Sequence, residues 1–177
     1  MRLLILTGMP GSGKEEFLKV AHESGISFLR MGDVVRLRYP DRSADQRNMC
    51  IGEYAESERH KHGYDIWAKR SLEKMNSGIL LVDGCRSMEE VNAFRSLTDD
   101  VTVIAIHSSP SVRYERLARR KRNDAPSNIH EFNERDEREI RWGLAKTIAL
   151  ADIMIYNGYS LEDFRKSSAD VLERMSL

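Results

Sequence analysis

Short runs of apolar residues alternate along the chain with longer, more polar stretches. The runs are typical of strands buried in a parallel sheet, and the stretches between them carry helix start and stop signals. The runs predict strands at Leu3–Thr7, Ile26–Leu29, Ile79–Val82, Val101–His107 and Ile153–Tyr156. Helices are expected at about 14–23, 64–75, 87–97, 110–122, 129–149 and 161–175. Because strands alternate with helices, we predict an α/β fold of three αβα layers around a five-stranded parallel sheet.

Single residues set several of these boundaries. Gly25 ends the first helix, and Ser87 begins another, with Glu90 three residues later as a capping box. Pro40 interrupts a polar, arginine-rich stretch at 34–61, to which we assign no helix.

The composition is that of a globular protein with one domain. The chain has 177 residues, of which 41% are hydrophobic and 32% charged, and its formal net charge is zero. A neutral chain is not expected to have nucleic acid as its main partner. The apolar runs are too short to cross a membrane, and no secretory signal is visible. With two distant cysteines and no CxxC spacing, we expect a cytoplasmic protein with two free thiols. We also expect a monomer or a small homo-oligomer.

A glycine-rich loop between the first strand and the first helix carries the strongest chemical signal. Glycines let backbone N–H groups wrap a phosphate chain, the helix start adds partial positive charge, and the lysine adds a full charge. The sequence therefore predicts a phosphate loop that binds ATP or GTP. Its residues are Gly8, Met9, Pro10, Gly11, Ser12, Gly13 and Lys14.

Glu15 departs from the usual loop, in which Ser or Thr follows the lysine and binds Mg²⁺. The carboxylate could hold the metal through water, could simply suit the first turn of a helix, or could mark weakened catalysis. We favour a Mg²⁺ ion held mainly by water and phosphate oxygens.

Two further motifs follow strands. Asp83 ends a buried strand and is expected at the carboxyl edge of the sheet, where it would hold Mg²⁺ through water, with Arg86 beside it for a phosphate. Asp33 can orient a hydroxyl or a metal-bound water, and Arg36 can clamp a phosphate. We predict that Asp33, Arg36 and Arg86 bind the acceptor.

A basic segment lies near residue 120 and has three interpretations. We assign Arg113 and Lys121 to a solvated helix face. The second interpretation, a strip that binds nucleic acid, is weakened by the neutral net charge and the lack of interleaved aromatic residues. The third interpretation is an arginine lid, hinged by the loop at 123–127, that closes over the transferred phosphate. Its catalytic members would be Arg120 and Arg122, supported by Arg116, Arg119, Arg135 and Arg138, the last two of which can also form surface pairs.

The order of these motifs resembles that of adenylate kinases and related nucleoside monophosphate kinases. The C-terminal stretch 149–162 is instead similar to dephospho-CoA kinase, and this likeness implies that Asn157 lies beside the ATP base. Over nearly its full length the chain resembles an uncharacterised archaeal family of P-loop kinase-like proteins. The resemblance implies an acceptor-binding insertion at about 37–62 and a lid at about 119–134 within the single domain.

Three functions remain open. The leading one is transfer of the γ-phosphoryl group of ATP to a nucleotide or nucleotide-like acceptor that carries a phosphate. A second is dephospho-CoA kinase-like transfer to a ribose hydroxyl, with Asp33 as general base. The third is a nucleotide-dependent switch or assembly ATPase, which Glu15 favours and the set of acceptor arginines opposes.

Overall fold

A five-stranded parallel sheet forms the centre of the molecule in a computed structural model that describes residues 2–76, 78, 80–120 and 125–175. The strand order is β2-β3-β1-β4-β5, and every neighbouring pair is parallel. This confirms the predicted fold, although the second strand begins two residues later than expected. The strands are β1 (Leu3–Thr7), β2 (Phe28–Arg30), β3 (Leu81–Asp83), β4 (Val101–His107) and β5 (Ile153–Tyr156).

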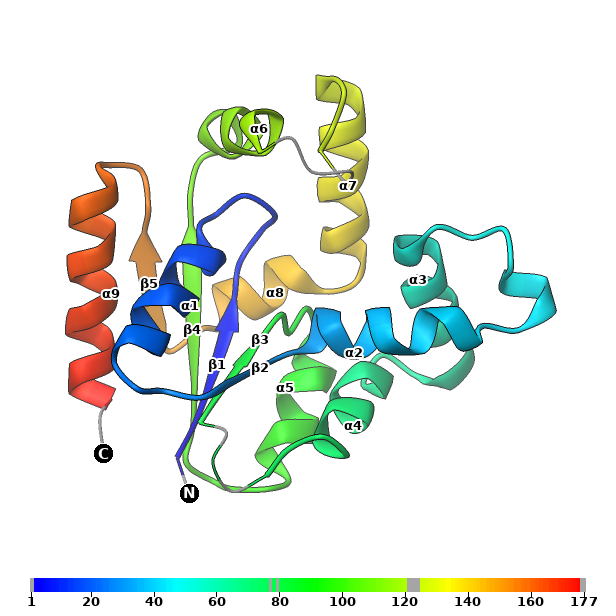
Figure 1. Ribbon diagram of the computed structural model, residues 1–177, viewed down its shortest axis with the longest axis horizontal. Coiled ribbons are helices and arrows are strands. Elements are labelled where there is room, and N and C mark those ends of the chain that lie inside the picture. Colours follow the sequence, from blue (N-terminus) through cyan, green and yellow to red (C-terminus); the bar gives the residue numbers. More distant parts are fainter. Residues whose placement is uncertain (1, 77, 79, 121–124, 176–177) are drawn as a thin grey trace.

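Helices cover both faces of the sheet (Figure 1). On one face, α1 (Lys14–Glu23) and α9 (Leu161–Met175) pack over side chains such as Leu6 and Ile104. On the other, α4 (Ile66–Leu72) and α5 (Met88–Arg95) pack with α2 (Met31–Arg38). Helices α6 (Pro110–Arg119) and α7 (Ile129–Arg141) lie beyond the carboxyl ends of the strands, where we expected the ligands.

The single long helix expected at 129–149 is wrong. The chain forms two helices, α7 and α8 (Leu144–Ala149), separated by Trp142 and by Gly143, which has a φ of +103°. This left-handed conformation favours glycine and ends α7. A Cβ on Gly143 would lie 3.3 Å from the Cβ of Ser87, so the turn also packs closely against the start of α5.

The arginine-rich stretch 34–61, to which no helix was assigned, is largely helical. It contains the end of α2, two short 3-10 helices, η1 (Tyr39–Asp41) and η2 (Ala44–Gln46), and most of α3 (Ile51–His62). Tyr54 of α3 is buried and contacts Trp67 of α4 edge-on at 5.8 Å between ring centroids. The segment at 37–62 therefore packs on the same core as α4 and α5.

A buried ion pair joins α3 to α5. Arg59 Nη2 donates to Glu90 Oε1 at 3.0 Å, and the two side chains are 1% and 0% exposed. The other Glu90 carboxylate oxygen accepts the backbone N–H of Arg86 at 2.6 Å. Ser87 Oγ accepts the N–H of Glu90, so only half of the predicted capping box forms as expected. Glu90 thus holds the chain at Arg86 while it compensates Arg59.

Cys50 and Cys85 are free thiols. Within the described ranges, every helix is too short or too polar to cross a bilayer.

We predict that Glu90→Ala lowers the free energy of unfolding by about 3–5 kcal/mol, because it leaves a buried guanidinium without its partner. Urea denaturation measures the change. Arg38→Ala removes one member of the exposed Arg38–Glu73 pair and is the matched control, for which little change is expected. Equal losses in the two variants would contradict a special role for the buried pair.

Candidate functional site

The phosphate loop connects β1 to α1 at the carboxyl edge of the sheet and turns through glycines with positive φ. Gly8, Gly11 and Gly13 have φ values of +147°, +80° and +116°. A Cβ on Gly13 would lie 2.2 Å from Asn157 Nδ2, and one on Gly8 would lie 2.5 Å from the carbonyl oxygen of Ile106. Glycine is therefore required at these two positions for close packing as well as for conformation.

Lys14 begins α1 and folds back over the loop. Its Nζ donates to the carbonyl oxygens of Gly8 (2.5 Å) and Met9 (3.3 Å). Burial lowers the pKa of Lys14 to about 8, and the nearby Asp83 carboxylate opposes this shift. The lysine is thus a desolvated ammonium for which phosphate oxygens would be strong partners.

A cavity of about 180 Å³ lies over the loop, and we call it the donor cavity. Its lining combines positive and negative side chains with the glycines. The charged residues of the lining are Lys14, Glu15, Asp83, Arg86, Arg120, Arg135 and Glu139.

Asp83 ends β3 within this lining, as predicted. Burial raises its pKa, and the nearby charges of Lys14 and Arg86 oppose the shift. Its Oδ1 is buried and, among the described residues, has no hydrogen-bond partner; the same holds for Ser12 Oγ. An unpartnered carboxylate oxygen beside a phosphate loop fits a Mg²⁺ ion held directly or through water. A second acid of the lining, Glu15, accepts a hydrogen bond from Arg30 Nη2 at 2.7 Å.

Asn157 follows β5 and braces the loop. Its Nδ2 donates to the carbonyl oxygen of Ser12 at 2.8 Å, and its Oδ1 accepts from Arg116 Nη2 at 3.1 Å. Arg116 also donates to Ser108 Oγ at 3.0 Å. Neither Asn157 nor Arg116 is part of the described lining of the donor cavity. The contacts give both residues a supporting position against the loop.

The assignment of Arg113 to a solvated helix face is wrong, because its side chain is only 4% exposed. Its two terminal nitrogens donate to the two carboxylate oxygens of Asp136 on α7, at 2.8 and 2.5 Å. One of them also donates to the carbonyl oxygen of Pro10 at 3.2 Å. Arg113 therefore ties α6, α7 and the phosphate loop together. Its burial depends on this partner in α7, which spacing within α6 could not reveal.

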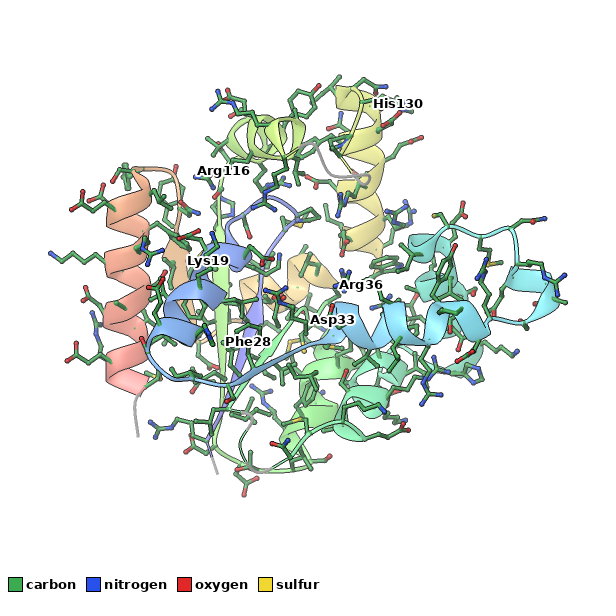
Figure 2. The ribbon with its side chains drawn as sticks, viewed as in Figure 1. Lys19, Phe28, Asp33, Arg36, Arg116 and His130 are labelled. Atoms are coloured by element: carbon green, nitrogen blue, oxygen red, sulfur yellow. The ribbon has the colours of Figure 1, made fainter. Side chains whose placement is uncertain are left out.

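A second cavity, of about 560 Å³, adjoins the donor cavity, and we call it the acceptor cavity. Helices α2, α3 and α7 form its walls. Four predicted site arginines line it, namely Arg36, Arg86, Arg135 and Arg138. Asp33 lies beside Arg36 on α2 and is ion-paired with it (Figure 2). The Asp33 side chain is 60% exposed and is in neither described lining.

Glu139 lies between the two cavities and was not predicted. It lines both of them, and its Oε2 accepts from Arg86 Nε at 2.6 Å. Burial tends to raise the pKa of Glu139, but Arg86 and other cations outweigh it and the pKa is lowered, so the group is ionised.

Trp142, at the end of α7, also lines the acceptor cavity. Three guanidinium groups surround the Trp142 ring. Their Cζ atoms lie 4.5 Å (Arg59), 5.5 Å (Arg86) and 5.7 Å (Arg138) from the ring centroid.

The remaining lid arginines are placed unevenly. Arg120 lines the donor cavity. Arg119 is exposed and lies 3.5 Å from Glu115, as a surface pair one helical turn apart. Arg122 and Lys121 lie outside the described residues. Of the predicted lid at 119–134, the described parts are therefore the end of α6, the segment 125–128 and the start of α7.

Sequence reasoning missed Arg30 and Glu139. Arg30 is the last residue of β2, and a charged residue at the carboxyl end of a strand was a usable signal. Glu139 gave a weaker signal, because it is one of many acids on a highly charged helix.

Comparisons with known proteins agree with this architecture. A family model described as "AAA domain" matches residues 4–141. A "UPF0200 protein" of Thermoplasma volcanium is 42% identical over 171 residues, which cover 96% of each chain. One of Methanopyrus kandleri is also 42% identical, over 96% of this chain and 88% of the relative.

Solved structures show the same fold at low identity. A shikimate kinase from Bacteroides thetaiotaomicron superposes with a TM-score of 0.67 at 16% identity, over 98% of this chain and 97% of its own. A gluconokinase from Sinorhizobium meliloti 1021 gives a TM-score of 0.61 at 15% identity, over 98% and 93%. At these identities the likeness concerns the fold.

The lowered pKa of Lys14 predicts a pH dependence of nucleotide binding. Phosphates favour the protonated lysine, so ATP raises its pKa, and binding above about pH 8 takes up a proton. Affinity should therefore fall as the pH rises from 8 to 9.5, by up to about tenfold per unit. Calorimetry at pH 9 in two buffers of different ionisation enthalpy measures the uptake.

Lys14→Arg is the control for this titration, because a guanidinium stays charged over the whole range. It should show neither the uptake nor the loss of affinity. The same proton uptake in wild type and Lys14→Arg would assign the titration to another group.

Proposed function

The chain belongs to the UPF0200 family and contains a P-loop domain of the AAA type, and from this premise we propose that it is a phosphotransferase. It moves the γ-phosphoryl group of ATP to a nucleotide or nucleotide-like acceptor that carries a phosphate. The bond between the γ-phosphorus and its bridging oxygen breaks, and a bond from that phosphorus to an acceptor oxygen forms.

The observation that carries the proposal is the shared wall of the two cavities. Arg86, Arg135, Glu139 and Ala125 line both of them. A nucleotide on the phosphate loop and a molecule in the acceptor cavity would therefore meet at this wall. Phosphoryl transfer depends mainly on such positioning and on charge stabilisation, and it needs no covalent enzyme intermediate.

Donor-side roles follow from the contacts. Lys14 and the loop amides hold the phosphates, and Arg120 and Arg135 lie where they can offset the charge of the transferred group. Asp83 would hold Mg²⁺, directly or through water, and the ion would supply charge neutralisation for the phosphates. Asn157, Arg113 and Arg116 keep the loop in shape.

On the acceptor side, arginines that line the acceptor cavity would bind the acceptor. Arg36 and Arg138 line it without lining the donor cavity, so they would hold the end of the acceptor remote from the transferred group. Arg86 is fixed by Glu139 at the shared wall and would hold the acceptor close to the γ-phosphate. Guanidinium groups suit phosphate oxygens in both places.

Transfer to a ribose hydroxyl with Asp33 as general base receives less support. The Asp33 carboxylate is exposed and paired with Arg36, and a base must lie within hydrogen-bond reach of the proton that it removes. A nucleotide-dependent switch differs in its products. A kinase yields a phosphorylated acceptor, whereas a switch yields only ADP and phosphate.

The direct test is a screen with γ-labelled ATP and Mg²⁺ against nucleoside monophosphates and dephospho-CoA. A labelled acceptor supports the proposal, and its identity separates phosphate from hydroxyl transfer. Release of labelled phosphate alone, with every acceptor, would favour the switch.

With the acceptor found, we predict that Arg36→Ala raises its KM about tenfold or more, because a charge-assisted hydrogen bond of about 1.5–3 kcal/mol is lost. The Kd for ATP should stay within about twofold of the wild-type value, because Arg36 lines the acceptor cavity and not the donor cavity. Arg119→Ala is the matched control, since it removes an exposed arginine outside both described linings. A rise in the Kd for ATP equal to the rise in the acceptor KM would contradict the assignment of Arg36.

A further inference from the structure

Glu15 presents an electrostatic problem at the donor site. It follows Lys14 directly and lines the donor cavity, so its carboxylate lies on the side where the triphosphate would bind. Without a counter-charge, a carboxylate there repels the phosphates, and the cavity already contains the ionisable Asp83 and Glu139.

Arg30 provides the counter-charge. Its Nη2 donates to Glu15 Oε1 at 2.7 Å, and both side chains are about one-third exposed. The Cζ atom of Arg30 lies 5.2 Å from the ring centroid of Phe28, two residues earlier in β2. This cation–π contact helps to orient the guanidinium group. Arg30 Nε is buried and has no hydrogen-bond partner among the described residues, so the side chain is held through the contact of its Nη2 with Glu15.

The position of Arg30 is set by the sheet. Arg30 is the register partner of Asp83, and both residues end their strands at the carboxyl edge. The positive charge of Arg30 lowers the pKa of Asp83, whereas the negative charge of Glu15 raises it. When Arg30 and Glu15 are paired, their opposite charges largely cancel. Asp83 is then left as the acid available to a metal.

We propose that Arg30 is a positioning residue of the donor site, which holds Glu15 and neutralises it so that a triphosphate can bind beside a carboxylate. The proposal rests on the nucleotide-binding half of the proposed function and not on the acceptor. Arg30 acts through Glu15, and its effect is therefore largest when no Mg²⁺ is present to take over the neutralisation.

The test measures ATP binding by calorimetry, once in EDTA and once in excess Mg²⁺. Without metal, Arg30→Ala should weaken binding about tenfold, because the Glu15 charge is exposed to the phosphates. With Mg²⁺, the loss should be less than about threefold, since the freed carboxylate can bind the metal or its waters. A merely structural defect would weaken binding equally in both conditions.

A double-variant cycle identifies Glu15 as the partner. Glu15→Gln combined with Arg30→Ala should restore metal-free binding to within about twofold of wild type, because the uncompensated charge is gone. Arg30→Lys keeps a positive charge and should recover most of the affinity. Arg38→Ala, at an exposed pair elsewhere, should leave ATP binding unchanged with and without Mg²⁺.

Equal losses of affinity in EDTA and Mg²⁺, or no recovery in the double variant, would overturn the proposal. If Arg30→Ala does not fold, as judged by thermal unfolding, Arg30→Gln replaces it in the same cycle. Failure of the proposed function has a different signature, namely wild-type protein that binds ATP but labels no acceptor. Wild-type protein that binds no ATP would overturn both.

Discussion

The site depends on the burial of the Lys14 ammonium group, which is desolvated in the folded protein. A buried lysine remains charged at neutral pH only if its surroundings supply partners, and here they are two loop carbonyls and the charge of Asp83. Asp83 is within reach because β3 pairs directly with β1, where Leu6 is its register partner. The crossover that places β3 between β2 and β1 is therefore also what places an acid beside the phosphate loop.

A second requirement is that the loop keep its shape with its N–H groups turned toward the ligand. Its carbonyl groups then need donors elsewhere, and the structure supplies them from α6 and from the residue that follows β5. Asn157 and Arg116 reach the Ser12 carbonyl, and Arg113 reaches that of Pro10. Arg113, which we assigned to a solvated helix face, and Arg116, which we assigned to a lid, thus support the loop, whereas Arg120 lines the donor cavity.

The parts of the site that sequence predicts well are those encoded within a few residues. The glycine spacing around Lys14, and Asp83 after a buried strand, each gave a local pattern that the structure places together. Other features depend on partners far away in the chain. The buried Arg113 is paired with Asp136, 23 residues later, and Glu139 at the wall of both cavities is paired with Arg86, 53 residues earlier. Periodicity within one helix contains no information about such partners.

The setting of Trp142 gives the protein an optical reporter of its own. The chain has two tryptophans, and the other, Trp67, is buried in the core against Tyr54. Trp142 lies in the wall of the acceptor cavity, with Arg86 and Arg138 near its ring. Indole emission responds to nearby charge, so a ligand that draws either guanidinium away would change the fluorescence of one residue without any label. Occupancy of the larger cavity can in this way be followed in solution, even for a molecule that is bound but never phosphorylated.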